Sequence, residues 1–378
     1  MYHVKTMNKI SKIGLAELDD RFAISDTMEH EDAILVRSAK LHDYDFPAEL
    51  KCIARAGAGV NNIPLDRAAD AGIVVFNAPG ANANGVKELT IAALLLASRK
   101  ISQGITWVKE QSAAGADVAA VVEKGKAAYV GPEIMGKTLG VVGLGAIGVL
   151  VANAAAALGM KIVGYDPFLS VTHALNLTPG VEVVDTLPEL YAKADYISLH
   201  LPMNDATRGT LNEAAFAAMK DGVRIVNLAR GELVDTPALK AALDSGKCAA
   251  YVTDFPNSET AAIEGVVAIP HLGASTPESE DNCAMMAARE VKEYLDNGSI
   301  INSVNLPNLT MAWAAKTRVC VISKGADAAA IAGAVPAVAS ASNTRGEYAY
   351  TILDTDAAVD EAAIAAIPGV LRVRVLTR

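Results

Sequence analysis

Three polar side chains follow short apolar runs in the second half of the chain. Arg230 stands in Asn-Leu-Ala-Arg-Gly, Glu259 comes shortly after Asp254, and His271 follows Ile-Pro. A histidine can take or return a proton near neutral pH, and a carboxylate beside its second ring nitrogen fixes the tautomer. A guanidinium can bind a carboxylate bidentately and polarise a carbonyl. As a set, these groups suit proton and hydride chemistry on a 2-hydroxy acid.

Each of these residues also has a simpler interpretation. A histidine after Ile-Pro is often a turn residue, an arginine at a strand end is often a surface charge, and a glutamate in a loop is often merely solvated. The interpretation as a catalytic set therefore depends on a cofactor site elsewhere in the sequence.

A glycine-rich segment predicts such a site. An apolar run is followed by Gly143, Gly145 and Gly148 in the spacing G-x-G-x-x-G, and then by an Ala-rich helical segment. Gly143 can turn tightly out of the strand, Gly145 lets backbone amides approach a pyrophosphate, and Gly148 allows close helix packing. The next strand ends at Asp166, whose carboxylate would accept both ribose hydroxyls and repel a 2'-phosphate. The segment indicates a dinucleotide site that favours NAD.

Further strand ends connect the glycine-rich segment with the three polar side chains. After the glycine segment, apolar runs end near Val184, His200, Leu228 and Asp254, and another spans Val266 to Ile269. Ligands of open α/β sheets bind outside the carboxyl ends of the strands. We therefore expect Arg230, Glu259 and His271 to converge on the crevice that holds the cofactor.

The remaining pattern predicts an α/β protein with two doubly wound parallel-sheet domains. Residues 1–97 with 277–305 would form a discontinuous domain, because the helices at about 84–103 and 277–297 are long enough to cross between domains. Residues 98–276 would form the dinucleotide (Rossmann) domain. The tail, residues 316–378, has the order βαββαβ and would form a third, small domain.

Composition narrows the class of partners. The chain has 378 residues, 52% of them hydrophobic, and a formal net charge of −10. That charge argues against nucleic acid or an anionic membrane as partner, so the expected partner is a small molecule. The four cysteines are scattered without metal-ligand spacing, and no metal site is expected. The start of the chain has no secretory pattern, which suggests a cytoplasmic protein.

At these motifs the chain resembles the D-isomer-specific 2-hydroxyacid dehydrogenases, over roughly residues 1 to 305. That family keeps an Arg in N-x-[AS]-R-G, a Glu after a strand-ending Asp, and a His in P-H-[LI]-[GA]. The resemblance implies an NAD-dependent oxidoreductase in which Arg230, Glu259 and His271 are catalytic. Besides the three glycines, it implies cofactor contacts at Ala146, Ile147, Asp166, Leu201, Leu228, Ala229, Asp254, Gly273 and Ala274.

Three segments near the start, residues 36–40, 54–62 and 77–79, resemble those that bind a phosphorylated substrate in one branch of the family. Arg37 and Arg55 would bind the phosphate, and Arg230 would hold the carboxylate. Backbone amides would also face the carboxylate, at Ala58, Gly59 and Val60. The resemblance thus implies oxidation of 3-phosphoglycerate to 3-phosphooxypyruvate, the first step of serine synthesis. The interpretation of Arg37 and Arg55 as surface charges stays open.

The tail is similar to an ACT regulatory domain. Its first loop, Ile322-Ser323-Lys324-Gly325-Ala326-Asp327, lacks the Asn and the Pro-Gly with which such domains bind serine. We therefore expect the tail to serve assembly more than serine feedback, within a homodimer or homotetramer.

Two other functions remain compatible with the sequence. One is a reductase of unphosphorylated hydroxypyruvate or glyoxylate on the same machinery, which would not need Arg37 and Arg55. The other is an NADH-sensing corepressor-like protein, which would bind NADH yet turn over 2-keto acids poorly.

Overall fold

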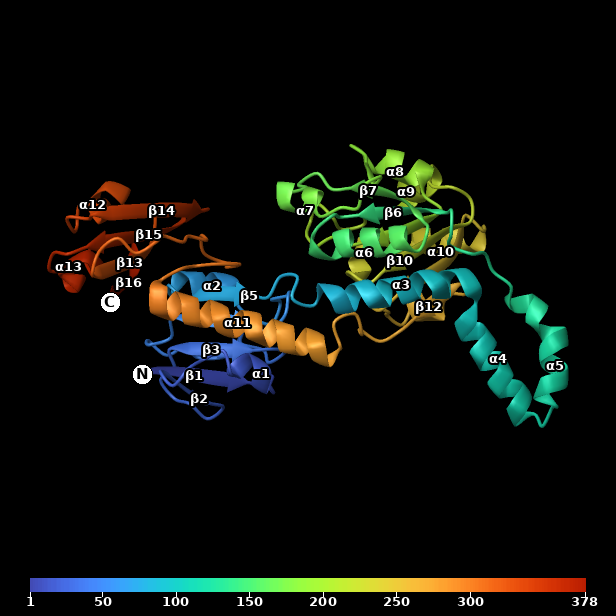
Figure 1. Cartoon of the computed structure of the whole chain (residues 1–378), viewed down its shortest axis with the longest axis horizontal. Coiled ribbons are helices and arrows are strands. Elements are labelled where there is room, and N and C mark those ends of the chain that lie inside the picture. Colours follow the sequence, from blue (N-terminus) through green and yellow to red (C-terminus); the bar gives the residue numbers. More distant parts are fainter. The chain divides into compact units, whose positions relative to one another are not determined.

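The computed structural model describes residues 1–378 and contains two compact units (Figure 1). Unit 1 comprises Met1–Asn82 and Pro277–Arg378, and unit 2 comprises Ala83–Thr276. Helix α3 (Ala83–Arg99) therefore counts with unit 2, whereas the sequence leads us to expect a boundary near residue 97. The tail, expected as a domain of its own, is part of unit 1.

Unit 1 is built on a five-stranded parallel sheet in the order β2-β1-β3-β4-β5. The strands are β1 (Tyr2–Met7), β2 (Phe22–Ser25), β3 (Ala33–Val36), β4 (Cys52–Arg55) and β5 (Val74–Asn77). β3 is buried along its whole length, as expected of a strand covered on both faces. β1 and β2 are not predicted from the sequence, because polar residues interrupt their apolar pattern.

Helices cover both faces of this sheet. Ala33 and Leu35 of β3 pack toward the core that includes α11 (Pro277–Asn297), while Ile34 and Val36 pack toward α2 (Leu65–Asp70). The buried face of α11 includes Cys283, Ala284, Ala287, Val291 and Tyr294. Short helix α1 (Lys12–Leu15) lies against α11 so closely that a Cβ at Gly14 would fall 2.4 Å from that of Ala284. The bounds of α11 agree with the sequence prediction.

Unit 2 holds a seven-stranded parallel sheet in the order β12-β11-β10-β9-β6-β7-β8. The strands are β6 (Thr138–Val142), β7 (Lys161–Tyr165), β8 (Glu182–Val183), β9 (Tyr196–Leu199), β10 (Val223–Asn227), β11 (Cys248–Thr253) and β12 (Val266–Ala268). The chain runs outward from β6 in both directions, so β6 and β9 flank the switch point at which dinucleotides bind. This is the doubly wound fold that the sequence predicts.

The helices of unit 2 join these strands. Besides α3 they are α4 (Ile101–Ala113), α5 (Val118–Gly125), η1 (Lys126–Tyr129), α6 (Ala146–Ala157), α7 (Val171–Leu175), α8 (Leu187–Lys193), α9 (Glu213–Ala218), η2 (Gly231–Leu233), α10 (Thr236–Asp244) and η3 (Thr260–Ala262). The helix expected over 84–103 ends early, because Lys100 adopts a left-handed conformation with φ of 39° and α4 begins anew. No residue of α4 or α5 is buried, and both helices stand apart from the sheet of unit 2 (Figure 1).

The tail folds as the expected βαββαβ. Its elements are β13 (Thr317–Lys324), α12 (Ala328–Ala332), β14 (Ala339–Arg345), β15 (Tyr348–Thr355), α13 (Glu361–Ala365) and β16 (Val370–Thr377), and the antiparallel order is β14-β15-β13-β16. β13 is buried on both faces: Val319 and Val321 pack with the tail's own helices, whereas Cys320 and Ile322 join the core around α11. The tail therefore shares a core with the five-stranded sheet of unit 1.

Side chains of the tail also cap the end of α11. Arg374 donates to the carbonyls of Tyr294 and Leu295, both at 2.9 Å, and Arg318 donates to that of Asn297 at 2.9 Å. The last carbonyls of a helix have no partner within the helix, and cations are favourable beside them. The tail thereby provides hydrogen-bond donors for the last carbonyls of α11, the helix that covers the five-stranded sheet.

Two further sequence expectations concern cysteines and membrane segments. All four cysteines are free and buried, in keeping with their apolar surroundings in the sequence. No helix combines the length and the apolar character needed to cross a membrane.

Candidate active site

The glycine segment forms a tight loop between β6 and α6. Gly143 has φ of +95°, and a Cβ there would lie 2.6 Å from the carbonyl oxygen of His200. A Cβ at Gly148 would lie 1.9 Å from the carbonyl oxygen of Gly143, so only glycine allows α6 to start this close to the strand. At Gly145, the N-cap of α6, a Cβ would meet nothing within 4 Å. This open space before a helix N-terminus fits a pyrophosphate.

The carboxylate of Asp166 is fixed at the same loop. Its Oδ2 accepts from the amide of Leu144 at 2.9 Å and its Oδ1 from the amide of Phe168 at 2.8 Å. A carboxylate in this position accepts ribose hydroxyls and disfavours a 2'-phosphate. The loop and the acid together fit an NAD molecule at the switch point, where His200 and Leu201 follow β9.

The three predicted catalytic residues follow three neighbouring parallel strands. Arg230 follows β10, Glu259 follows β11 and His271 follows β12. The ring of Phe255 is near two of them: its centroid is 5.2 Å from the guanidinium carbon of Arg230 and 4.3 Å from the ring centroid of His271. The structure thus brings Arg230 and His271 to the same aromatic ring.

Glu259 is placed less closely. It is exposed at the start of η3, and no hydrogen bond or ion pair joins it to His271. Catalytic hydrogen bonds are often long without substrate and tighten when it binds. Glu259 therefore lies at the predicted sheet edge without the predicted contact.

Asn227 and Phe255 belong to the site although spacing alone does not single them out. Fully buried Asn227 accepts from the amides of Ala229 and Arg230, at 3.1 and 3.3 Å, and donates to the carbonyl of Arg230 at 2.7 Å. These bonds hold the turn that presents the Arg230 side chain. The Asn of the Asn-Leu-Ala-Arg-Gly motif could have pointed to the role of Asn227 from the sequence. No sequence pattern points to the contacts of the Phe255 ring with Arg230 and His271.

Asp254 supports the loop that carries His271. Its Oδ2 accepts from the amide of Gly273 at 2.9 Å, and a Cβ at Gly273 would stand only 3.2 Å from that oxygen. Burial raises the pKa of Asp254, while the Gly273 amide and the nearby His271 act in the opposite direction. Its Oδ1 is buried without a partner. That acceptor fits the carboxamide donor of a nicotinamide, and Leu228 and Ala229 follow the neighbouring strand β10.

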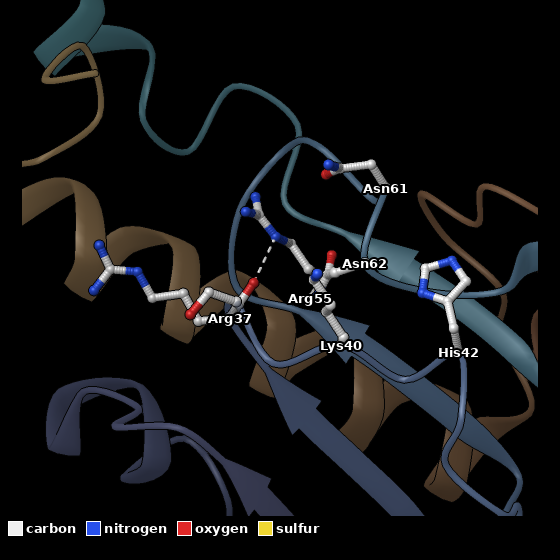
Figure 2. A pocket seen from close by; sticks show the side chains of 7 residues that line it. Arg37, Lys40, His42, Arg55, Asn61 and Asn62 are labelled. Carbon is white, nitrogen blue, oxygen red and sulfur yellow. Dashed lines mark hydrogen bonds between the residues drawn. The ribbon is translucent and has the colours of Figure 1, made fainter. Parts of the chain in front are cut away.

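A basic hollow of about 570 Å³ lies at the carboxyl ends of β3 and β4 in unit 1 (Figure 2). It is lined by Arg37, Ser38, Lys40, His42, Arg55, Asn61 and Asn62. Arg55 donates through Nε to the carbonyl of Arg37 at 3.0 Å. A Cβ at Gly57, which has φ of +150°, would lie 1.9 Å from Nη1 of Arg55, so glycine leaves the space that the guanidinium fills. Three cationic side chains, with His42 beside them, make this hollow suitable for an anion.

Two predicted substrate contacts have distinct surroundings in this hollow. The guanidinium of Arg37 extends away from Arg55 (Figure 2) and forms an ion pair with Glu280 at 2.8 Å. The adjoining loop contains the backbone amides of Ala58, Gly59 and Val60. These amides donate no hydrogen bond within the protein. Free amides in such a loop can receive a carboxylate.

Comparison with known proteins agrees with this geometry. Residues 91–273 match the family described as D-isomer specific 2-hydroxyacid dehydrogenase, NAD binding domain. These residues belong to that family. The resemblance noted in the sequence is thereby confirmed, and unit 2 contains an NAD-binding domain.

Several relatives are similar over a larger part of the chain. D-3-phosphoglycerate dehydrogenase of Methanocaldococcus jannaschii is 35% identical over 315 residues, which cover 81% of this chain and 58% of the relative. The enzyme of the same name from Archaeoglobus fulgidus is 39% identical over 288 residues, covering 74% and 52%. The chain thus spans somewhat more than half the length of these curated relatives.

Solved structures share the fold. A glyoxylate reductase from Paecilomyes thermophila is 28% identical with a TM-score of 0.66, covering 80% of this chain and 98% of that one. NAD+-bound 3-phosphoglycerate dehydrogenase from Entamoeba histolytica is 26% identical with a TM-score of 0.62, covering 82% and 99%.

Proposed function

We propose that the chain is an NAD-dependent D-3-phosphoglycerate dehydrogenase, which oxidises 3-phosphoglycerate to 3-phosphooxypyruvate in serine synthesis. The observation that carries the proposal is the basic hollow lined by Arg37, Lys40 and Arg55, because an uncharged substrate end would need no cluster of cations. The similarity to D-3-phosphoglycerate dehydrogenases over most of the chain supports it.

In this proposal each side chain has one role. His271 takes the proton of the substrate's 2-hydroxyl group as the hydride leaves the carbon, and Glu259 supports the imidazolium once substrate is bound. Arg230 holds the substrate carboxylate and polarises the reacting oxygen. Phe255 and Asn227 keep Arg230 and His271 in place. Bound NAD supplies the hydride acceptor, and the loop from Gly143 to Gly148 with Asp166 would hold it.

His271→Ala tests this assignment of roles. Without a group to accept the hydroxyl proton, turnover should fall by about 10²–10⁴-fold, while NADH binding is retained. Steady-state rates and a fluorescence titration with NADH measure the two quantities separately. Near-normal turnover of the variant would show that His271 is not the proton acceptor.

A second candidate is a reductase of unphosphorylated hydroxypyruvate or glyoxylate. One observation favours it: Glu280 pairs with Arg37 and thereby reduces the net positive charge beside the hollow. Such an enzyme would use the same catalytic residues but would gain nothing from Arg55.

We also propose that the chain forms a homo-oligomer through α4 and α5. Neither helix buries a residue, and Ile101, Ile105 and Val108 are 42%, 52% and 38% exposed along one helix. Clustered apolar exposure of this kind indicates an interaction surface. A solution mass that is a multiple of 39.2 kDa would support the proposal, and a monomer would contradict it.

A further inference from the structure

Glu280 forms an ion pair with Arg37, one of the cationic residues that line the basic hollow. Its Oε1 is 2.8 Å from Nη2 of Arg37, and the two side chains are 45% and 39% exposed. Glu280 comes from the first turn of α11, whereas Arg37 directly follows β3. Solvent can therefore reach this ion pair, and another anion can compete for it.

Glu280 and both arginines influence the pKa of the neighbouring thiol of Cys283. Cys283 lies one turn further along α11 and is buried. Burial raises the pKa of its thiol; Arg55 and Arg37 oppose that shift, and Glu280 adds to it. The ion pair with Arg37, which lines the hollow, places the carboxylate of Glu280 beside the hollow.

The two arginines differ in how firmly they are held. Arg55 is fixed by its Nε bond to the carbonyl of Arg37 and by its place against Gly57. Arg37 is oriented by an exposed carboxylate, and exposed ion pairs contribute little stability. A phosphate dianion has more charge than a carboxylate and three oxygens with which to accept hydrogen bonds. It can therefore replace Glu280 on Arg37.

We propose that Glu280 is a specificity-determining residue, whose carboxylate competes with the substrate's phosphate for Arg37 and so raises the KM for the phosphorylated substrate. Arg55 and Lys40 provide the constant part of the phosphate site, and Arg37 joins them only when Glu280 is displaced. After displacement, the carboxylate still benefits from the N-terminal dipole of α11. The inference rests on the proposed function.

Glu280→Gln is the direct test, because glutamine keeps the shape and one acceptor oxygen but loses the charge. With NADH as reductant, the KM for 3-phosphooxypyruvate should fall about three- to tenfold, as expected for removing a like charge near a dianion in a water-like medium. Inorganic phosphate, as an inhibitor of hydroxypyruvate reduction, should bind more tightly by a similar factor. The KM for hydroxypyruvate itself should not change.

Glu278→Gln provides a matched control. Glu278 is an exposed acid in the same first turn of α11, and it forms no ion pair. Both substitutions remove a favourable charge from the helix N-terminus, but only Glu280→Gln releases Arg37. The control should leave all three constants as in the wild type.

One outcome concerns an enzyme that prefers 3-phosphooxypyruvate and loses this preference in Arg55→Ala. In that enzyme, an unchanged or higher KM for 3-phosphooxypyruvate in Glu280→Gln would overturn the inference and leave the proposed function standing. Glu280 would then only position Arg37. A wild-type enzyme with no preference for the phosphorylated substrate would instead overturn the proposed function, and the inference would fall with it.

Discussion

Unit 1 uses arginines in two contrasting ways. Arg37 and Arg55 line a hollow, and Arg37 pairs with a half-exposed carboxylate. Arg318 and Arg374 lie in strands β13 and β16 of the tail, where they are 0% and 6% exposed. All four carry the same guanidinium, and each of them lies in a β-strand or directly follows one. Only their surroundings distinguish the arginines that can bind a ligand from those that stabilise the fold.

The buried arginines have their donors committed to the protein. Arg318 binds Asp354 through two bonds, at 2.7 and 2.9 Å, stacks on Trp313 and donates to the carbonyl of Asn297. Arg374 donates to two carbonyls at the end of α11 and lies over the ring of Tyr294. An incoming anion would have to enter a closed core to reach either residue. These arginines join the tail to α11.

Arg37 of the hollow has an exposed partner, which a ligand can replace. An arginine is thus available to a ligand when the groups that it binds are exposed, and it is structural when those groups are buried. It also explains why the tail belongs to unit 1, since the tail supplies cations to the C-terminal end of α11.

Asp354→Asn tests the role of the buried arginines, and it has the largest expected effect on stability. Removing one partner of a fully buried ion pair leaves an uncompensated charge, so the free energy of unfolding should fall by about 3–5 kcal/mol. Urea unfolding followed by tryptophan fluorescence measures this, with Trp313 lying on Arg318.

The matched control for that experiment is Asp70→Asn. Asp70 pairs with Lys324 of the tail at 2.7 Å, and these side chains are 55% and 37% exposed. Its loss should lower the free energy of unfolding far less than the loss of Asp354 does, because exposed ion pairs contribute little to stability. Equal losses in the two variants would refute the distinction between buried and exposed pairs.

Glu290→Gln examines a buried acid that has no cation as partner. Glu290 lies on α11, accepts from Asn302 at 2.7 Å and leaves Oε2 without a partner. Burial raises its pKa to about 8. Because the folded pKa lies above the unfolded value near 4.5, the stabilisation is complete below about pH 4.5 and is lost as the pH rises through 8.

Glutamine is neutral at every pH, so the stability of the variant relative to the wild type should rise by about 4 kcal/mol between pH 5 and pH 9. Unfolding midpoints at the two pH values measure the difference. A constant difference across this range would mean that Glu290 is ionised in the folded protein throughout.

The sequence predicted the features that depend on local pattern. The apolar spacing of α11 and the glycines of the β6–α6 loop can be recognised from residues that are close in the sequence. The carboxyl ends of β10 to β12 can be predicted from the apolar runs that precede them. The break at Lys100 was not predicted, because neither glycine nor proline marks it.

Contacts between distant residues could not be predicted in the same way. The pairing of Arg37 with Glu280 joins a strand end to a helix start far along the chain, and the ring of Phe255 contacts Arg230 and His271 only after three strands have aligned. The capping of α11 by Arg374 likewise requires the tail to be folded. The roles assigned to Arg230, Glu259 and His271 stay predictions until kinetics test them.

The most direct test of the account is the rate of NADH oxidation with 3-phosphooxypyruvate and with hydroxypyruvate, for the wild type and for Arg55→Ala. The wild type should strongly prefer the phosphorylated substrate. Arg55→Ala should raise the KM for that substrate by about 10–100-fold, because charge-assisted hydrogen bonds to the phosphate are lost, and should leave hydroxypyruvate reduction unchanged. Equal use of both substrates by the wild type, with no effect of Arg55→Ala, would contradict the account and favour a reductase of unphosphorylated acids.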